Sequence, residues 1–398
     1  LKSLINKRLS IDDLQISTKA IKLNDLILLV RSFKNSVELF VLGNIIKDGF
    51  LVSDINLNFD NNGKIKNDYE INGFIKKGKL NFLKKYSIDD LNLVFNIKDK
   101  KYYLEDIRGN FNQIRLSSQS IQIKEKDNYL LINGKFKNDK KNIDKKILNN
   151  LLENRFKDST IKKISFSSEN DFSFALNKKF KISDFNLESI IDLNNFVYKN
   201  NSLDIQKYLP NFKDTIKLED HKISINYKKD ELEIKGKGPI SIDNKIDYLG
   251  YELNRKNNHY NFNTTINLEK NSLLLDVLDY KKDKDLQAIV NVSGSYKKNK
   301  EIKFNSISLS DDDENIFAIK GLNLNNEFKI NNINSLDFNY INKNKNKNQI
   351  SLRKNKNKYE IYGESFDATK LIHKLLNNNE ESPSIFNNLN SKVNIKIN

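Results

Sequence analysis

Apolar and polar residues alternate along most of the chain with a period of two. The segment 54–60, DINLNFD, places Ile55, Leu57 and Phe59 on one side, and 222–238 repeats this pattern. Runs rich in Asn, Lys, Asp and Gly separate such segments; they lie at 60–64, 137–142, 296–301 and 342–349. Alternation of this kind is typical of half-buried strands, and the intervening runs are typical of turns. The sequence therefore predicts an all-β fold.

Nearly every predicted strand keeps one face of Lys, Asn, Asp and Ser. Only LILLV at 26–30 and SLLLDVL at 272–278 depart from this alternation, with consecutive apolar residues as in strands that are buried on both faces. Most strands should therefore meet water on one side, and long open sheets curl. We expect an elongated, curved, mostly antiparallel sheet that forms an open apolar groove, a β-taco-like fold.

Two or three short amphipathic helices interrupt this pattern. The segment 145–157 has helical spacing, and 203–209 adds a single turn before Pro210. In 367–376 the helical stripe consists of Ala368, Leu371, Ile372, Leu375 and Leu376. Ser365 or Asp367 would cap this last helix. We expect it to lie across the groove or close its end; the alternative is a helix that packs on a local core.

The helix at 145–157 suggests a division of the chain. We expect an N-terminal β-groove segment over 1–157 and a C-terminal one over 158–398, joined as one continuous sheet. Both would be part of a larger protein, because the sequence contains no methionine and Leu1 would begin an excised segment or a processed chain.

A strand pattern of apolar, any, apolar, any, glycine recurs along the chain. Its six occurrences are Tyr69-Ile71-Gly73, Leu130-Ile132-Gly134, Leu232-Ile234-Gly236, Val290-Val292-Gly294, Phe317-Ile319-Gly321 and Tyr359-Ile361-Gly363. Each glycine falls on the face of the two apolar residues before it, because side chains alternate along a strand. Glycine within a strand marks a bulge, a bend or a close approach of other atoms. The pattern is explained either by sheet curvature or by space for a ligand.

Composition favours a folded chain with a large polar surface. Hydrophobic residues make up 38% and charged residues 30% of the sequence, but 24 Phe, 16 Tyr and only 3 Pro argue against disorder. The net charge of +16 is spread along the whole chain, so a basic polyanion-binding surface stays a minor alternative and we expect no nucleic acid as partner. The longest apolar run has five residues, whereas a membrane span needs about 20. Any membrane anchor would lie outside this segment.

Residues that could support catalysis or metal binding are sparse. His221, His259 and His373 are far apart and lack metal-ligand spacing. No phosphate loop, nucleophile elbow or zinc motif occurs. The acidic run 311–314 lacks the alternation and glycine of a calcium loop, which favours a solvated turn. We expect no enzymatic activity, no catalytic residue, no metal and no cofactor.

The C-terminal part of the chain resembles a known family. GESFDATKLIHKLL at 363–376 is similar to the glycine-x-Ser-Phe-Asp-Ala element and leucine-rich helix of the AsmA-like proteins of Gram-negative bacteria, in their YhdP/TamB group. The matching residues are Gly363, Ser365, Phe366, Asp367, Ala368 and Leu371. The segments 231–253 and 273–294 also resemble the family's pattern, in the same order. Thr369 and Lys370 stand where the family often has Arg-Pro, and residues 1–200 share only the strand rhythm.

This resemblance implies a bridge-like lipid-transfer protein. Such a protein is periplasmic, with an inner-membrane anchor that would lie outside this segment, and carries phospholipid between the inner and outer membranes to support outer-membrane biogenesis. Its partners would be phospholipid acyl chains, and membranes through other parts of the protein. The alternative is a structural or adhesive β-protein whose sheet is filled by its own side chains.

The residues expected to contact lipid follow from the glycine pattern and the terminal helix. They are Tyr69, Ile71, Ile75, Leu130, Ile132, Phe136, Leu232, Ile234, Val290, Val292, Tyr296, Phe317, Ile319, Tyr359, Ile361, Leu371, Ile372 and Leu375.

Overall fold

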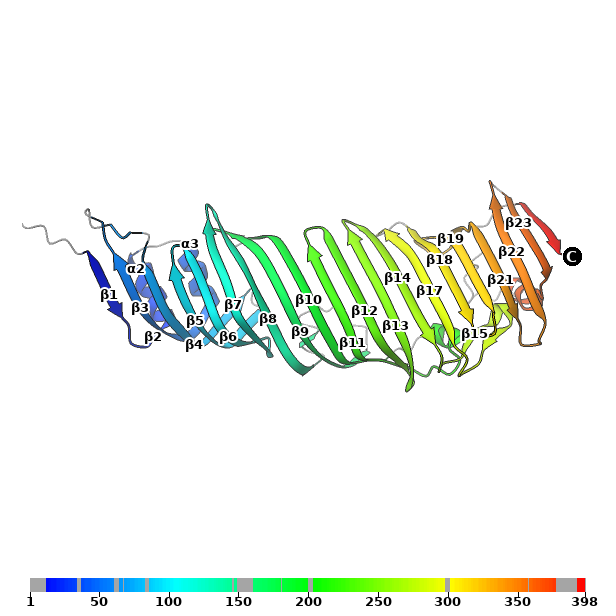
Figure 1. The fold of residues 1–398 in the computed structure, drawn as a ribbon, viewed down its shortest axis with the longest axis horizontal. Coiled ribbons are helices and arrows are strands. Elements are labelled where there is room, and N and C mark those ends of the chain that lie inside the picture. Colours follow the sequence, from blue (N-terminus) through cyan, green and yellow to red (C-terminus); the bar gives the residue numbers. More distant parts are fainter. Residues whose placement is uncertain are drawn as a thin grey trace, which may run out of the picture. The chain divides into compact units, whose positions relative to one another are not determined.

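The computed structural model confirms the all-β class. It describes residues 12–33, 37–60, 64–66, 68–82, 86–144, 147–148, 160–179, 181–199, 203–297, 301–356, 358–376 and 392–397. In each of the two units described below, the strands form a curved, mostly antiparallel sheet (Figure 1). The chain divides into two units, which are described separately below. The N-terminal unit comprises 1–155, 166–190 and 227–229, and the C-terminal unit comprises 156–165, 191–226 and 230–398.

The N-terminal unit is a succession of antiparallel neighbours. Its elements are β1 (Asp13–Ser17), β2 (Ile21–Lys22), α2 (Leu23–Phe33), α3 (Val37–Ile45), β3 (Ile46–Asn58), β4 (Glu70–Phe82), β5 (Tyr86–Lys98), β6 (Lys101–Phe111), β7 (Ile114–Lys126), β8 (Tyr129–Ile143), most of β9 (Thr160–Asn177) and the first half of β10 (Ile182–Lys199). Strands β3 to β8 pair in chain order, and β1 and β2 both pair with β3. Such pairing of consecutive strands follows from the short hairpin connections that the turn signals predict.

The C-terminal unit continues the same architecture. Its elements are α5 (Leu203–Tyr208), β11 (Thr215–Lys228), β12 (Glu231–Ile242), β13 (Lys245–Lys256), β14 (His259–Leu268), β15 (Leu273–Leu275), η1 (Asp276–Leu278), β16 (Tyr280–Lys282), β17 (Ala288–Lys297), β18 (Glu301–Asp311), β19 (Ile316–Asn325), β20 (Ile330–Asn332), β21 (Ser335–Ile341), β22 (Lys347–Asn355), β23 (Lys358–Ser365), α6 (Thr369–Leu376) and β24 (Lys392–Ile397). Strands β12, β13, β14, β17, β18, β19, β21, β22 and β23 pair antiparallel in that order, and β24 pairs parallel to β23.

Strands β15 and β16 pair with each other and form, with η1, an excursion between β14 and β17. This excursion packs onto the sheet through Tyr280, whose ring centroid lies 4.6 Å from that of Phe317 and 6.1 Å from that of Tyr340. The Tyr280 hydroxyl donates to the Asp311 carboxylate, and the Tyr340 hydroxyl donates to the Leu278 carbonyl at 2.9 Å. Hydrogen-bonded aromatic side chains therefore fix the excursion on one face of the sheet, where it forms the main apolar core of the C-terminal unit.

A row of β-bulges crosses the N-terminal unit and accounts for its curvature. Gly49, Lys77, Asp90 and Asp106, on β3 to β6, have φ angles between +48° and +134°, and the strand register shifts or skips at these positions. The Asn92 side chain joins two of them, because it accepts from the Lys77 amide at 3.1 Å and donates to the Asp90 carbonyl at 2.7 Å. Bulges bend a strand and increase its twist, so a row of them curls the sheet along one line.

Two apolar runs that resemble doubly buried strands have other structures. LILLV lies in α2, whose Leu23 and Ile27 are buried while Leu28 and Leu29 are exposed. Asp25 in its first turn and Arg31 in its last turn suit the helix dipole. SLLLDVL forms β15 and η1, not a long strand.

The other predicted helices and turns agree with the structure in part. The helices expected at 203–209 and 367–376 are present as α5 and α6, whereas α2 and α3 were not predicted. The turn expected at 137–142 is wrong, because β8 runs through it. Of the helix expected at 145–157, Ile147 and Leu148 are helical and the remainder lies outside the described residues.

The bulge row makes Lys77 a test of the curvature. Its φ of +53° is left-handed, a conformation that a β-branched residue tolerates poorly. We expect Lys77→Val to lower the free energy of unfolding by about 1–2 kcal/mol, as measured by urea denaturation. The variant Lys77→Gly should avoid most of this loss. Lys124→Val is the matched control, because Lys124 is an exposed position of regular strand β7 where valine fits. An equal loss at Lys124 would show that the effect does not come from the bulge.

Candidate functional site

The strand register aligns apolar residues from many strands into continuous rows. In the N-terminal unit one row crosses seven strands by direct cross-strand partners, and we call it the isoleucine row. Its members are Ile16, Ile55, Ile71, Ile97, Tyr102, Ile123 and Ile132. Directly opposed residues lie on the same face of a sheet. The isoleucine row is therefore one apolar band that runs perpendicular to the strands.

The C-terminal unit has two such rows side by side. The central row consists of Gly236, Tyr251, Thr264, Val292, Ile307, Ile319, Leu336, Leu352 and Ile361. The covered row, two residues away along each strand, consists of Gly238, Leu249, Ile266, Val290, Leu309, Phe317, Phe338, Ile350 and Gly363. Thr264 is the only polar residue in these eighteen positions.

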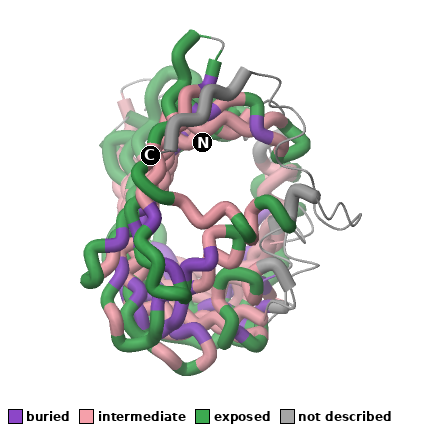
Figure 2. The backbone as a smooth tube through the Cα atoms, turned by 90° about the vertical axis from the view of Figure 1, so that its right-hand side faces the viewer, coloured by how far each residue is buried: buried purple, intermediate pink, exposed green. Residues whose placement is uncertain are grey.

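Burial differs between these rows. The excursion packs on the covered row, where Leu309 and Phe317 are 7% and 5% exposed. The apolar side chains of the central row are half-buried, as are those of the isoleucine row apart from Ile16, which is 40% exposed. Figure 2 shows that most of the backbone is intermediate or exposed and that buried segments are few. The central row and the isoleucine row are thus apolar bands that the described residues leave partly open.

Most of the predicted lipid-contacting residues lie on the apolar face of the sheet, which carries these rows. Ile71, Ile132, Val292, Ile319 and Ile361 lie in the isoleucine row or the central row. Ile75, Leu130, Phe136, Leu232, Ile234, Val290, Tyr296, Phe317 and Tyr359 lie on the same faces by strand alternation. Tyr69 precedes the first residue of β4, and the side chain of Leu375 lies outside the described residues.

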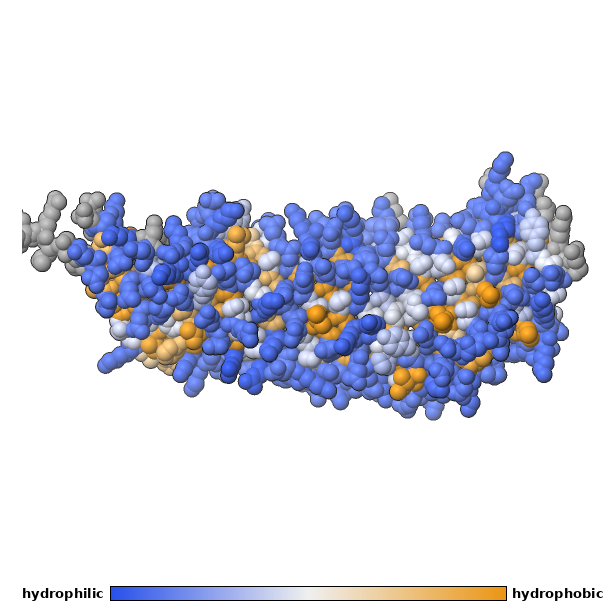
Figure 3. Space-filling model, in the orientation of Figure 1, coloured by the Kyte–Doolittle hydropathy of each residue, from blue (hydrophilic) through white to orange (hydrophobic). Residues whose placement is uncertain are grey.

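The opposite face of the sheet is polar. Asn96 donates to Asn72 and Glu70, and Lys98 pairs with Glu70 at 3.8 Å. In the C-terminal unit Lys235 lies 2.7 Å from Glu233, and this contact raises its pKa. Figure 3 shows this side of the strands, with α2 and α3 behind them, as mostly hydrophilic with separate apolar patches. Many lysines of this face have carboxylate partners, which reduces its value as a polyanion-binding surface.

The repeated glycines do not leave empty space. A Cβ at Gly73 would lie 2.6 Å from the Phe95 ring, and one at Gly236 would lie 2.2 Å from the Tyr251 ring. Gly294 is covered in the same way by Phe262, at 2.8 Å. In each pair the aromatic residue is the direct cross-strand partner of the glycine. For these three glycines the interpretation as room for a ligand is therefore wrong, because the neighbouring strand supplies the ring that covers them. At Gly134, Gly321 and Gly363 the space is taken by other atoms, from Ile121, Asn334 and Gln349.

The curvature interpretation holds for Gly294 as well, and for Gly321 and Gly363. The register shifts at Gly294 and next to Gly363, and Gly321 has a φ of +63°. The covering rings could have been found from sequence at one site. The two-residue turn Asp243-Asn244 sets the β12–β13 register, and that register places Tyr251 opposite Gly236.

His221 fills part of the apolar face in the C-terminal unit. It is fully buried, its ring stacks on Tyr251 with centroids 5.6 Å apart, and it occupies the space beside Gly238. Neither ring nitrogen makes a hydrogen bond. Burial lowers the pKa of His221 below its ordinary value of 6.5, and the smaller effect of the Pro239 backbone opposes this shift.

Helix α6 docks on the excursion through its first turn. The Lys370 ammonium lies 2.6 Å from Asp279 and 3.4 Å from Asp276, and these contacts raise the pKa of Lys370. Asp367 accepts from the Thr369 amide at 3.1 Å and so supports the helix start, whereas Ser365 donates to the Lys347 carbonyl. Lys370 therefore joins the start of α6 to the excursion.

The apolar stripe of α6 is only partly buried. Leu371 is half-buried, but Ile372 is 50% exposed. The described part of this stripe does not form a closed cap.

The described residues form no candidate metal site. Within them, no three His, Asp or Glu side chains are grouped so that they could hold a metal ion. The acidic run is a turn in which Asp311 accepts from the amides of Asp313 and Asn315. Among the described helices, none combines the length and the apolar character needed to cross a bilayer.

Comparison of the chain with family models, with curated proteins and with solved structures gave no match.

Gly236 tests whether the glycines are seats for aromatic rings. We expect Gly236→Ala to lower the free energy of unfolding by about 1–3 kcal/mol, the usual cost of overpacking, because Tyr251 must move. Gly250 is the matched control on the facing strand, since a Cβ there meets no atom within 4 Å. Alanine at Gly250 should leave stability unchanged or raise it by about 0.5–1 kcal/mol in urea denaturation. Equal effects at the two sites would refute the ring-seat explanation.

His221 should make the C-terminal unit sensitive to mild acid. Because its folded pKa is lowered, the unfolded chain takes up a proton near pH 6.5 while the native state resists it, so stability falls as pH drops through this value. Above pH 6.5 both states are neutral and the contribution disappears. We expect His221→Phe to lose less stability than the parent between pH 7.5 and pH 5, by urea denaturation. His259→Gln, at an exposed position, should keep the parent's pH dependence.

Proposed function

We propose that this chain carries the acyl chains of phospholipids along the apolar face of its curved sheet, without chemical conversion. The observation that supports the proposal most directly is the pair of half-buried apolar rows, one in each unit, that cross seven and nine strands. Such a row offers an alkyl chain continuous apolar contact perpendicular to the strands.

The energetics of acyl chains favour this kind of surface. Exposing a chain of about 16 carbons to water costs on the order of 13 kcal/mol at ~0.8 kcal/mol per methylene. An apolar band removes most of that barrier by contact alone. The only hydrogen-bonding side chains of the central row are those of Thr264 and Tyr251. Few polar groups would therefore hold a lipid at one point.

The cellular role that we propose rests on the AsmA-like resemblance. In that setting the chain would act in the periplasm of a Gram-negative bacterium, belong to a protein anchored in the inner membrane, and move phospholipid between the two membranes to support outer-membrane biogenesis.

A second function is favoured by a specific observation. Parts of the apolar face are filled by the chain itself, through the excursion on the covered row and through His221 and Tyr251 over the glycines. A structural or adhesive protein with a self-filled sheet would extend this arrangement to all rows.

Site-specific photo-crosslinking separates the two functions. We expect crosslinkers at Ile132, Val292 and Ile361 to capture phospholipid in cells, with the adducts identified by mass spectrometry. Crosslinkers at Asn133 and Lys320 are the matched controls, because these exposed positions adjoin the rows in sequence but face the opposite side. Equal lipid capture on both faces, or none at the three row positions, would favour the self-filled protein.

A further inference from the structure

A cavity of about 340 Å³ lies in the N-terminal unit, next to helix α3 and the ends of two strand pairs. Its apolar lining comes from Leu42 of α3, Leu130 of β8 and Leu176 of β9. Glu125 at the end of β7, Asp127 of the β7–β8 turn and Lys178 of the β9–β10 turn, all exposed, also line it. The volume is at the lower end of the range of about 300–1,000 Å³ for small-molecule sites.

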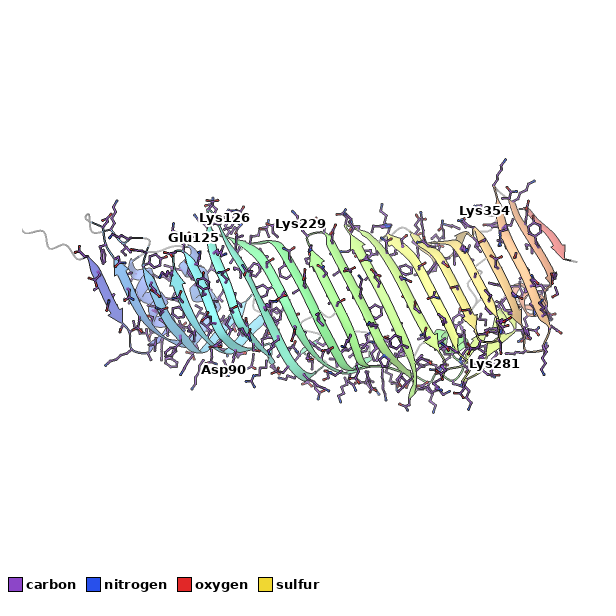
Figure 4. The ribbon with its side chains drawn as sticks, in the orientation of Figure 1. Asp90, Glu125, Lys126, Lys229, Lys281 and Lys354 are labelled. Atoms are coloured by element: carbon purple, nitrogen blue, oxygen red, sulfur yellow. The ribbon has the colours of Figure 1, made fainter. Side chains whose placement is uncertain are left out.

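The cavity is continuous with the isoleucine row. Leu130 stands two residues before Ile132 on the same face of β8, and its direct partner across the hairpin is Glu125. An alkyl chain that entered beside Leu130 would therefore meet Ile132 and Ile123 next. The Glu125 carboxylate rises on that same face, at the end of β7, and Figure 4 shows Glu125 and Lys126 together at this strand end.

The charges around the cavity are of both signs. Two carboxylates, of Glu125 at the end of β7 and of Asp127 in the β7–β8 turn, lie on one side, and the ammonium of Lys178 belongs to the β9–β10 turn. A phosphoethanolamine headgroup carries the complementary set, with an anionic phosphate for Lys178 and a primary ammonium that donates to the carboxylates. An anionic headgroup without an amine would meet two carboxylates of its own sign, and a choline headgroup has no N–H to donate.

We propose that this cavity is a lateral entry site for phospholipids with a zwitterionic headgroup that contains a primary ammonium. The inference rests on the proposed function, because it requires that lipid moves along the isoleucine row. The headgroup stays at the rim, between the two turns, while the acyl chains pass Leu42 and Leu130 onto the row.

Uptake from vesicles tests this assignment. The purified chain is mixed with phosphatidylcholine vesicles that contain acyl-labelled phosphatidylethanolamine or phosphatidylglycerol with identical acyl chains. We expect faster uptake of the ethanolamine lipid, and Lys178→Glu should slow it by about two- to fivefold, the worth of one exposed charge contact. The double variant Glu125→Lys with Asp127→Lys should reverse the preference towards phosphatidylglycerol.

Two further variants keep the test specific. Lys126→Glu makes the same charge change as Lys178→Glu on the residue beside Glu125, but Lys126 does not line the cavity, so uptake should not change. Leu42→Trp should obstruct the cavity and slow both lipids alike, independently of headgroup charge. Circular dichroism of each variant confirms that the sheet is intact.

The outcomes separate this inference from the proposed function. If Ile132 and Ile361 still crosslink lipid but neither the charge variants nor Leu42→Trp alters uptake, the entry site is refuted while lipid transport stands. Equal changes with Lys126→Glu and Lys178→Glu would refute it as well, because the effect would come from net charge. If no lipid is captured at any row position, both proposals fail.

Discussion

Antiparallel pairing in register is the interaction on which the rest of this structure depends. Each hairpin sets which residues face each other, and a slip of one residue would turn every side chain of a strand to the other face. Because successive hairpins keep one register, Ile71 opposes Ile97 and Ile123 opposes Ile132, and the isoleucine row results. The same rule produces the central row from nine strands. Neither row depends on a helix or a second sheet for its alignment.

A single-layer sheet of this kind has to resolve a conflict between solubility and binding. Its apolar face loses stabilisation wherever nothing covers it, since burial contributes about 25 cal/mol per Å². The C-terminal unit covers one row with the excursion and with Tyr280, and leaves the adjacent central row half-buried. Ile319 and Leu352 of this row pack against Ile330, Ile333 and Tyr359, and its remaining exposed area is a cost in stability that a bound alkyl chain would offset. This links the incomplete core directly to the proposed transport of lipid.

Different residues bend the sheet and fill its apolar face. Bulges at Lys77, Asp90 and Asp106 bend the sheet, with Asn92 holding two of them together. Three of the strand glycines serve as seats for rings from a neighbouring strand, as Gly73 does for Phe95. A glycine in a strand lacks a side chain to pack, and a cross-strand aromatic ring replaces the missing contact. These rings fill gaps in the apolar face without a second layer of secondary structure.

The fold class, the apolar and polar faces of the strands, and the terminal helix could all be predicted from the amino-acid pattern. These are local properties, because alternation with a period of two and helical spacing at 367–376 can be read from neighbouring residues. The cross-strand partner of most residues required the three-dimensional structure. Strand register depends on hairpin turns and on bulges that shift it by one residue. The stacking of His221 on Tyr251, the ion pair of Lys370 with Asp279, and the cavity beside Leu42 all join residues that are distant in the chain. Periodicity carries no information about such contacts, because it describes one strand at a time and they arise between elements.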